Sequence, residues 1–315
     1  MTSGRPTAAD SDDDAGALSS LPSVLVGLVG AGIQASRTPR LHEREGARQG
    51  LRYVYKLIDL EALGLDADAL PGILTSAQRF GFAGLNITHP CKQAVIPLLD
   101  DLSPDAAALG AVNTVVLKDG RRVGHNTDWW GFAESFRREL ADVRRERVVQ
   151  FGAGGAGAAV AHALLTLGAG EVILIDTDQR RAQTLTAALR ERFGDRRASC
   201  GSSAEVAVAT ADGIVNTTPL GMAKYPGMAL PAELLRPDLW VADIVYFPLE
   251  TELLAAARKR GCRTLNGEGM AVYQAARAFE LFTGRSANVD RMRMAFEGFR
   301  NVGEAEAAGL RETTG

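Results

Sequence analysis

Residues 84–92 carry the clearest sign of chemistry, because small polar groups and one amine follow directly on an apolar run. Asn86, Thr88 and Lys92 are these groups, and the residues before them have the pattern of a buried strand. Partial burial lowers the pKa of an amine and makes it a usable proton donor and acceptor. The segment therefore predicts acid–base chemistry, on a substrate that the rest of the chain must identify.

Other small polar side chains fall at the ends of predicted strands in the same half of the chain. Asn113 lies in a predicted apolar strand, where an amide needs backbone or ligand partners. Asp128 begins a predicted helix, and an ordinary N-cap is its alternative role. Ser36 and Thr38 could equally be turn and cap residues of a helix that starts at Pro39. Because ligands of open α/β sheets bind at strand ends, the groups together indicate a binding site.

A glycine-rich loop follows a short apolar strand and opens an alanine-rich helix. It consists of Gly152, Ala153, Gly154, Gly155, Ala156 and Gly157. The first glycine makes the tight turn, the second lets a pyrophosphate approach the backbone, and the last lets helix and strand pack closely. The loop predicts a dinucleotide site, and a βαβ crossover without a ligand is the alternative.

Asp176 ends the next strand, about 20 residues after the loop, and bears on the choice of dinucleotide. A carboxylate there accepts hydrogen bonds from the ribose hydroxyls of NAD and repels the 2′-phosphate of NADP. Arg180 and Arg181 are counter-evidence, because either could hold a phosphate. The sequence therefore favours NAD.

Alternating strands and helices must position these groups. Strands are predicted at residues 24–29, 53–58, 83–87, 111–117 and 121–125, with helices at 39–49 and 66–80. Asp119-Gly120 between the last two strands is a hairpin signal, which makes this sheet mixed. A helix is predicted at 128–140, and a doubly wound series follows it. That series has strands at 148–151, 172–175, 213–215, 240–244 and 263–265, an alanine-rich helix from the end of the glycine loop to Leu167, and a helix at 179–193. Two terminal helices, near 270–282 and 289–299, could pack back on the first sheet.

The predicted fold class is α/β with two domains. Residues 21–125 together with 268–302 form the expected substrate domain, which contains the mixed sheet. Residues 126–267 form the expected Rossmann-like nucleotide domain. Residues 1–20, which are rich in Asp, Ser, Ala and Gly, and residues 303–315 are expected to be disordered tails.

Composition narrows the functional classes. The 315 residues are 46% hydrophobic and 23% charged, as in an ordinary globular chain, and no apolar run approaches the roughly 20 residues of a membrane span. The net charge is only −3, so nucleic acid and membrane are not expected partners. Three cysteines without paired spacing and four scattered histidines predict neither disulfides nor a metal site. A reducing, cytoplasmic setting is expected.

Several motifs together resemble the shikimate dehydrogenase superfamily, most closely its quinate/shikimate dehydrogenase branch. The matching segments are residues 36–46, 84–92, 110–114, 124–128, 152–157, 216–222, 243–248 and 269–274. The resemblance implies an NAD-dependent oxidoreductase that takes a hydride from a ring 3-hydroxyl. It would interconvert quinate with 3-dehydroquinate and shikimate with 3-dehydroshikimate, as a monomer or homodimer.

The resemblance also assigns roles to residues. Lys92 and Asp128 are implied as the catalytic pair, with Lys92 as general acid and base. The implied substrate binders are Ser36, Thr38, Thr88, Asn113 and Gln274. Thr217, Gly269 and Arg181 join the glycine loop and Asp176 as expected cofactor residues. Two alternatives stay open: an aminoshikimate or aminoquinate dehydrogenase, and a non-catalytic NAD-binding regulatory module, against which the intact pair argues.

Overall fold

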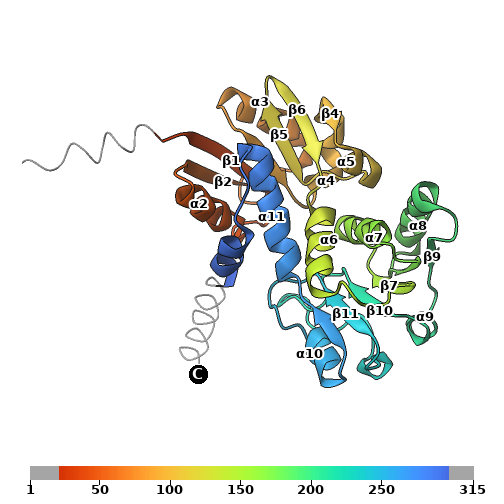
Figure 1. The fold of residues 1–315 in the computed structure, drawn as a ribbon. Coiled ribbons are helices and arrows are strands. Elements are labelled where there is room, and N and C mark those ends of the chain that lie inside the picture. Colours follow the sequence, from red (N-terminus) through yellow and green to blue (C-terminus); the bar gives the residue numbers. More distant parts are fainter. Residues whose placement is uncertain (1–20, 298–315) are drawn as a thin grey trace, which may run out of the picture.

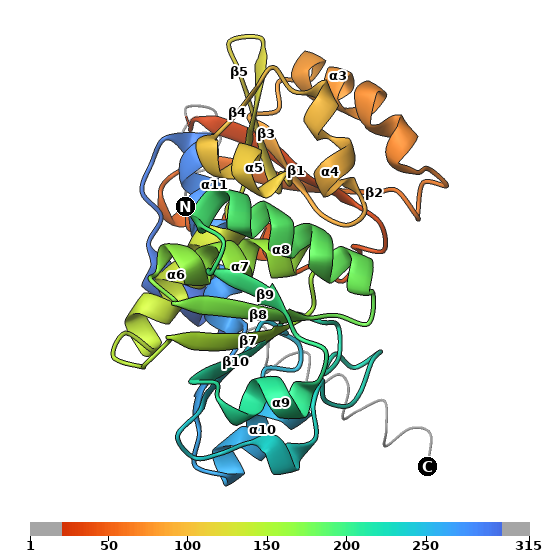
Figure 2. The same cartoon turned by 90° about the vertical axis from the view of Figure 1, so that its right-hand side faces the viewer.

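The computed structural model describes residues 21–297, in which the chain forms two six-stranded sheets flanked by helices (Figures 1 and 2). The predicted two-domain α/β class is confirmed by these sheets, one built from each half of the chain. Both predicted tails, residues 1–20 and 303–315, lie outside the described residues, as do residues 298–302. No helix in residues 21–297 is long and apolar enough to cross a membrane.

The first sheet is mixed, as predicted. Its strands are β1 (Ser23–Gly30), β2 (Arg52–Asp59), β3 (Gly84–Ile87), β4 (Asp101–Leu102), β5 (Thr114–Lys118) and β6 (Arg121–His125), in the order β2-β1-β3-β5-β6-β4. β1 is parallel to β2 and β3, whereas β5 is antiparallel to β3 and β6. The β5–β6 hairpin turns through Asp119 and Gly120, which both have positive φ, as the Asp-Gly signal predicts.

Helices of this half are α2 (Thr38–Arg48), α3 (Leu70–Arg79), α4 (Cys91–Ala94) and α5 (Pro104–Leu109), with 3₁₀ turns at Ala67–Ala69 and Ile96–Leu98. Two predictions about element ends are wrong. Thr38 is the first residue of α2 rather than its cap, and its N–H lies 3.4 Å from Ser36 Oγ. β5 begins only at Thr114, so Asn113 precedes the strand, where its side chain accepts the Thr127 N–H at 2.7 Å.

The second sheet is entirely parallel. Its strands are β7 (Arg147–Phe151), β8 (Glu171–Ile175), β9 (Ala198–Cys200), β10 (Gly213–Asn216), β11 (Trp240–Asp243) and β12 (Arg263–Leu265), in the order β12-β11-β10-β7-β8-β9. Its helices are α6 (Asp128–Glu139), α7 (Gly155–Thr166), α8 (Gln179–Phe193), α9 (Ala204–Ala209) and α10 (Glu252–Lys259), with a 3₁₀ turn at Ala232–Leu234. β7 and β10 are neighbours at the centre, and their carboxyl ends form the switch point where ligands of such sheets bind.

α11 (Glu268–Thr283) links the two halves: it packs along α6 and then reaches the first sheet (Figure 1). Its Phe279 and Phe282 share a buried cluster with Tyr53 and Tyr55 of β2. This is the return to the first sheet that the terminal helices were expected to make.

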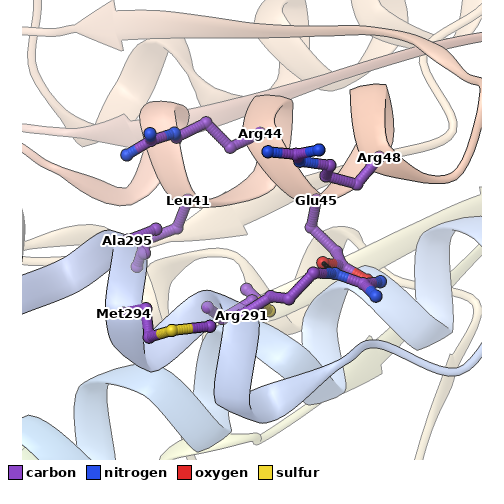
Figure 3. A pocket seen from close by; sticks show the side chains of 8 residues that line it. Leu41, Arg44, Glu45, Arg48, Arg291, Met294 and Ala295 are labelled. Atoms are coloured by element: carbon purple, nitrogen blue, oxygen red, sulfur yellow. Dashed lines mark hydrogen bonds and ion pairs between the residues drawn. The ribbon is translucent and has the colours of Figure 1, made fainter.

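A second terminal helix, over residues 289–297, lies against α2 (Figure 3). Arg291 donates to both carboxylate oxygens of the buried Glu45, at 2.7 and 3.0 Å. Burial by itself would raise the pKa of Glu45, but hydrogen bonds from Arg291, the Asn288 backbone and Gln49 hold it below its ordinary value. A cavity of about 370 Å³ opens beside this ion pair, away from the residues singled out in the sequence.

Candidate functional site

Lys92 and Asp128 are in direct contact. Lys92 Nζ lies 2.6 Å from Asp128 Oδ2, and the two side chains are 23% and 12% exposed. Lys92 is carried by the short helix α4, and Asp128 is the first residue of α6. A charged hydrogen bond this sheltered is stronger than an exposed ion pair, so it fixes the amine while leaving it within reach of a ligand. We refer to these two residues as the lysine–aspartate pair.

Asn126, which the sequence reasoning overlooked, leaves Asp128 free for this contact. Its Oδ1 accepts the backbone N–H groups of Asp128 and Trp129, at 3.1 and 3.4 Å. The side-chain capping considered for Asp128 is therefore performed by Asn126, two residues earlier. An asparagine just ahead of a predicted helix was the signal that could have identified this role.

Asn113 and Gln274 converge on the same end of α6. Asn113 Nδ2 donates to Asp128 Oδ1 and to Thr127 Oγ1, both at 2.9 Å. The Gln274 side-chain oxygen lies 3.5 Å from Thr127 Oγ1. The structure thus brings three of the singled-out residues, Asp128, Asn113 and Gln274, into one polar network.

The loop after β1, which carries Ser36 and ends at Thr38 of α2, lies beside the loop that leads to Lys92. The Thr88 N–H bonds Val29 O at 2.9 Å, and the Ala31 N–H bonds His89 O at 3.0 Å. Residues 30 and 88 are so close that a Cβ at Gly30 would overlap the Thr88 methyl. Glycine at this position therefore keeps the two loops side by side.

Asp59, at the carboxyl end of β2, was also missed, although it shapes the Ser36 loop. Its two carboxylate oxygens accept the backbone N–H groups of Gly32 and Ile33, at 2.9 and 3.0 Å. Its position at the end of a strand that neighbours β1 was an available signal, because carboxyl ends of parallel strands share one edge.

The segment that follows β11 connects this site to the second sheet. The Arg37 guanidinium lies 4.7 Å above the centre of the Phe247 ring. Desolvation raises the pKa of the neighbouring Tyr246 hydroxyl. The charges of Lys92, Asp128 and Arg37 also act on that hydroxyl, so the half-exposed Tyr246 lies within electrostatic range of the lysine–aspartate pair. The segment after β11 therefore lies beside Arg37 and within electrostatic range of the pair.

The glycine loop has the form of a phosphate cradle. A Cβ at Gly152, whose φ is +98°, would lie 2.7 Å from Thr217 Oγ1, and one at Gly157 would lie 2.9 Å from it. Packing against Thr217 therefore explains these two glycines. Gly154 and Gly155 are different, because none of residues 21–297 lies within 4 Å of a Cβ placed at either position. A group from outside the chain, such as a pyrophosphate at the start of α7, would fill that space.

Asp176 faces this loop from the end of β8. Its Oδ2 accepts the Ala153 N–H at 2.7 Å, and Arg181 Nη1 lies 4.0 Å from the same oxygen. Thr217 Oγ1 lies 2.8 and 2.9 Å from the carbonyl oxygens of Phe151 and Gly152, so it braces the loop. Gly269 lies apart from the loop, on α11, where a Cβ would overlap the Ser135 hydroxyl of α6. Close packing of these two helices accounts for Gly269.

Residues 28–115 match the model of the shikimate dehydrogenase substrate-binding domain, and residues 267–295 match that of the shikimate 5′-dehydrogenase C-terminal domain. A Streptomyces avermitilis protein named shikimate dehydrogenase (NADP+) is 62% identical over 274 residues, which cover 86% of this chain and 94% of that protein. The chain belongs to the shikimate dehydrogenase family.

Other members of the shikimate dehydrogenase family carry a different cofactor in their names. A Corynebacterium efficiens protein named quinate/shikimate dehydrogenase (NAD+) is 50% identical over 278 residues, 87% of this chain and 98% of that protein. The solved structure of quinate dehydrogenase from Corynebacterium glutamicum in complex with NAD has a TM-score of 0.84 and 47% identity. The match covers 88% of this chain and 99% of the quinate dehydrogenase chain. The resemblance stated from the sequence motifs is confirmed by these relatives.

Proposed function

We propose that this protein is a dinucleotide-dependent dehydrogenase that oxidises the ring 3-hydroxyl of quinate and of shikimate, with NAD as the hydride acceptor. The observation that carries the proposal is the 2.6 Å contact between Lys92 and Asp128, whose charges act on Tyr246 in the segment after β11. A base at this place can take a proton from a substrate that lies between the two sheets. The names of the relatives from Streptomyces and Corynebacterium support the same substrates.

In the proposed reaction the chain transfers the proton and the cofactor accepts the hydride. Lys92 Nζ accepts the proton of the ring hydroxyl while the carbon–oxygen double bond forms and the hydride departs. A bound nicotinamide supplies the hydride acceptor. Asp128 holds the amine in place, and Asn113 holds Asp128 through its other oxygen. In the reverse direction, the lysine ammonium returns the proton to the ketone oxygen.

Hydroxyl and amide groups of this chain suit a neutral ring polyol, because each can both donate and accept hydrogen bonds. We assign Thr88, Asn113 and Gln274 to the ring hydroxyls. Ser36 and Thr38, with nearby backbone N–H groups, would bind the substrate carboxylate. The support is their placement on loops and elements that meet around the lysine–aspartate pair.

Asp176 supports NAD as the cofactor. Each of its oxygens accepts one backbone N–H, from Ala153 and from Asp178, and each keeps a lone pair for a ribose hydroxyl. A 2′-phosphate would meet this carboxylate and be repelled. Arg181 is the nearby cation, but its guanidinium already lies within ion-pair distance of Asp176 and Asp178.

Initial rates of reduced-dinucleotide formation, measured with quinate or shikimate and with NAD or NADP, test this proposal. We expect turnover of both ring polyols and a higher kcat/KM with NAD than with NADP. Absence of turnover with either polyol would refute the substrate assignment. Equal or better kcat/KM with NADP would refute only the cofactor assignment.

A further inference from the structure

A continuous line of side-chain hydrogen bonds crosses the first sheet, from β2 to Asp128. The Tyr55 hydroxyl donates to Asn86 Oδ1 at 2.7 Å, and Asn86 Nδ2 donates to Thr114 Oγ1 at 3.0 Å. The Thr114 hydroxyl donates to Asn113 Oδ1 at 3.1 Å, and Asn113 Nδ2 donates to Asp128 Oδ1 at 2.9 Å. The five side chains belong to β2, β3, β5, the residue before β5, and α6. All five residues are buried, with at most 8% of the whole residue exposed.

The hydroxyl of Tyr55 determines which group donates and which accepts at each hydrogen bond of this line. A tyrosine hydroxyl that donates to Asn86 Oδ1 turns the amide nitrogen of Asn86 toward Thr114. Thr114 has a single hydroxyl hydrogen, and because its oxygen already accepts from Asn86, that hydrogen goes to Asn113. Asn86 Nδ2 also donates to the Asn113 carbonyl oxygen, at 3.3 Å. Without the tyrosine donor, this longer bond would be left to oppose a turn of the Asn86 amide that presents its oxygen to Thr114 and draws the hydroxyl hydrogen away from Asn113.

Asn113 is therefore held from two sides. The Thr127 N–H binds its oxygen from the α6 side at 2.7 Å, and the Thr114 hydroxyl binds the same oxygen from the sheet side. The amide nitrogen that remains fixes Asp128 Oδ1, while Asp128 Oδ2 faces Lys92. Loss of the bond from the sheet side would let Asn113 move, and Asp128 would move with it.

We infer that Tyr55 is a positioning residue for the lysine–aspartate pair, acting through Asn86, Thr114 and Asn113 from the far side of the sheet. The inference rests on the proposed function for its kinetic consequence, but the geometric coupling between Tyr55 and Lys92 can be measured without any turnover. Neither the composition of the 84–92 segment nor the family resemblance assigned a role to Tyr55.

Tyr53 provides a matched control on the same strand and the same face. It is buried to the same degree as Tyr55, at 7% against 6% exposure, and its hydroxyl pairs with His42 Nδ1 at 3.0 Å instead of with Asn86. Tyr53→Phe and Tyr55→Phe thus each delete one buried, hydrogen-bonded hydroxyl. A merely structural loss would affect both variants alike.

Steady-state kinetics is the first test. We expect Tyr55→Phe to lower kcat roughly fivefold, the fold-change of one net hydrogen bond, with an unchanged KM for NAD. Tyr53→Phe should retain kcat within about twofold, because its bond lies outside the line. Thr114→Val should reproduce the loss, Thr114→Ser should restore kcat, and the double variant Tyr55→Phe/Thr114→Val should be no slower than either single variant. Equal kcat in the two tyrosine variants, or additive losses in the double variant, would overturn the inference.

Acylation of Lys92 is the second test and needs no substrate. Purified enzyme is treated with acetic anhydride, and mass spectrometry compares labelling of Lys92 with that of the exposed Lys118 and Lys224. Asp128 from α6 holds the amine in a 2.6 Å contact, and an amine released from this contact is freer to reach the reagent. Lys92 should therefore be acylated severalfold faster in Tyr55→Phe than in the wild type or in Tyr53→Phe. Unchanged labelling in Tyr55→Phe would overturn the inference, whereas an inactive wild type would refute only the proposed function.

Discussion

At the residue scale, one carboxylate serves two partners: Asp128 Oδ2 faces the Lys92 amine, and Asp128 Oδ1 accepts the Asn113 amide. One oxygen thus gives the amine a charged partner, and the other fixes the orientation of the carboxylate. Both side chains keep some exposure, so a substrate can reach them without the full cost of burying an ion pair.

Replacement of Asp128 by Asn should keep the shape of the side chain and remove its charge. We expect kcat to fall by about 10² or more, because the amine loses the group that orients it for proton transfer. The KM for NAD should stay unchanged. Asp101→Asn, a change at an exposed aspartate of β4, serves as the control. A kcat within about threefold of the wild type would show that Asp128 does not assist proton transfer.

Asp176→Asn should shift the cofactor preference. The amide keeps an acceptor for the Ala153 N–H but no longer repels a 2′-phosphate. The ratio of kcat/KM for NAD to that for NADP should fall by roughly tenfold, as expected for the loss of one charge contact. Rates with both dinucleotides measure it, and Asp195→Asn at an exposed site supplies the control. An unchanged ratio would show that Asp176 does not determine the preference for NAD over NADP.

At the scale of elements, the contact between α6 and α11 sets the distance between the polar groups that these helices carry. A Cβ at Gly131 would lie 2.7 Å from Met270 O and 2.9 Å from Gln274 N, so the helices can approach only because this residue is glycine. Asp128 lies one turn before Gly131 on α6, and Gln274 lies on α11. Helix packing and site geometry are therefore coupled here.

Gly131→Ala should push α11 away from α6. Overpacking of this kind lowers the free energy of unfolding by about 1–3 kcal/mol. We also expect a lower kcat, because Asp128 and Gln274 would move apart. Gly72→Ala is the matched control in α3, where no atom of the described part of the chain lies within 4 Å of an added Cβ. That change should instead stabilise the protein by roughly 0.5–1 kcal/mol. Denaturant unfolding and kcat are measured for both variants. A Gly131→Ala enzyme as stable and active as the wild type would contradict the coupling between helix packing and site geometry.

Element prediction succeeded where periodicity and turn chemistry agreed. The hairpin at Asp119-Gly120 and the helix over residues 179–193 appear as predicted. The short α4 was missed, since four residues are too few to show a helical period. The contact between Asn113 and Asp128 could not be predicted either, because it joins residues that the fold brings together. Motifs identified the polar groups, and only the fold could show which of them touch.

At the scale of the whole molecule, stability should depend on pH through buried groups outside the site. Burial lowers the pKa of His42 to about 3 and that of His162 to about 4. Burial raises the pKa of Asp243 to about 6, although the Val245 N–H, Thr251 and Asn216 bind its charged form. The histidines therefore contribute stability that is present above pH 6.5 and lost on acidification, whereas the contribution of Asp243 is present below pH 4 and lost as pH rises through 6.

His42→Gln isolates one of these opposing contributions. At pH 5 the wild type should have lost roughly 2 kcal/mol through His42, because protonation is favoured only in the unfolded chain below pH 6.5. The variant, which cannot be protonated there, should lose less unfolding free energy between pH 7 and pH 5. His89→Gln, at an exposed histidine, should keep the wild-type slope. Identical slopes in all three proteins would exclude His42 as an origin of acid sensitivity.

The most direct test of the central claim is the initial rate of NADH formation by the wild type and by Lys92→Met, each at saturating NAD with quinate or shikimate. Methionine keeps the length of the side chain but cannot accept a proton. We predict turnover of both polyols by the wild type and a loss of kcat of about 10² or more in Lys92→Met, the usual contribution of a general base. A Lys92→Met enzyme that oxidises either polyol at the wild-type rate would contradict the account.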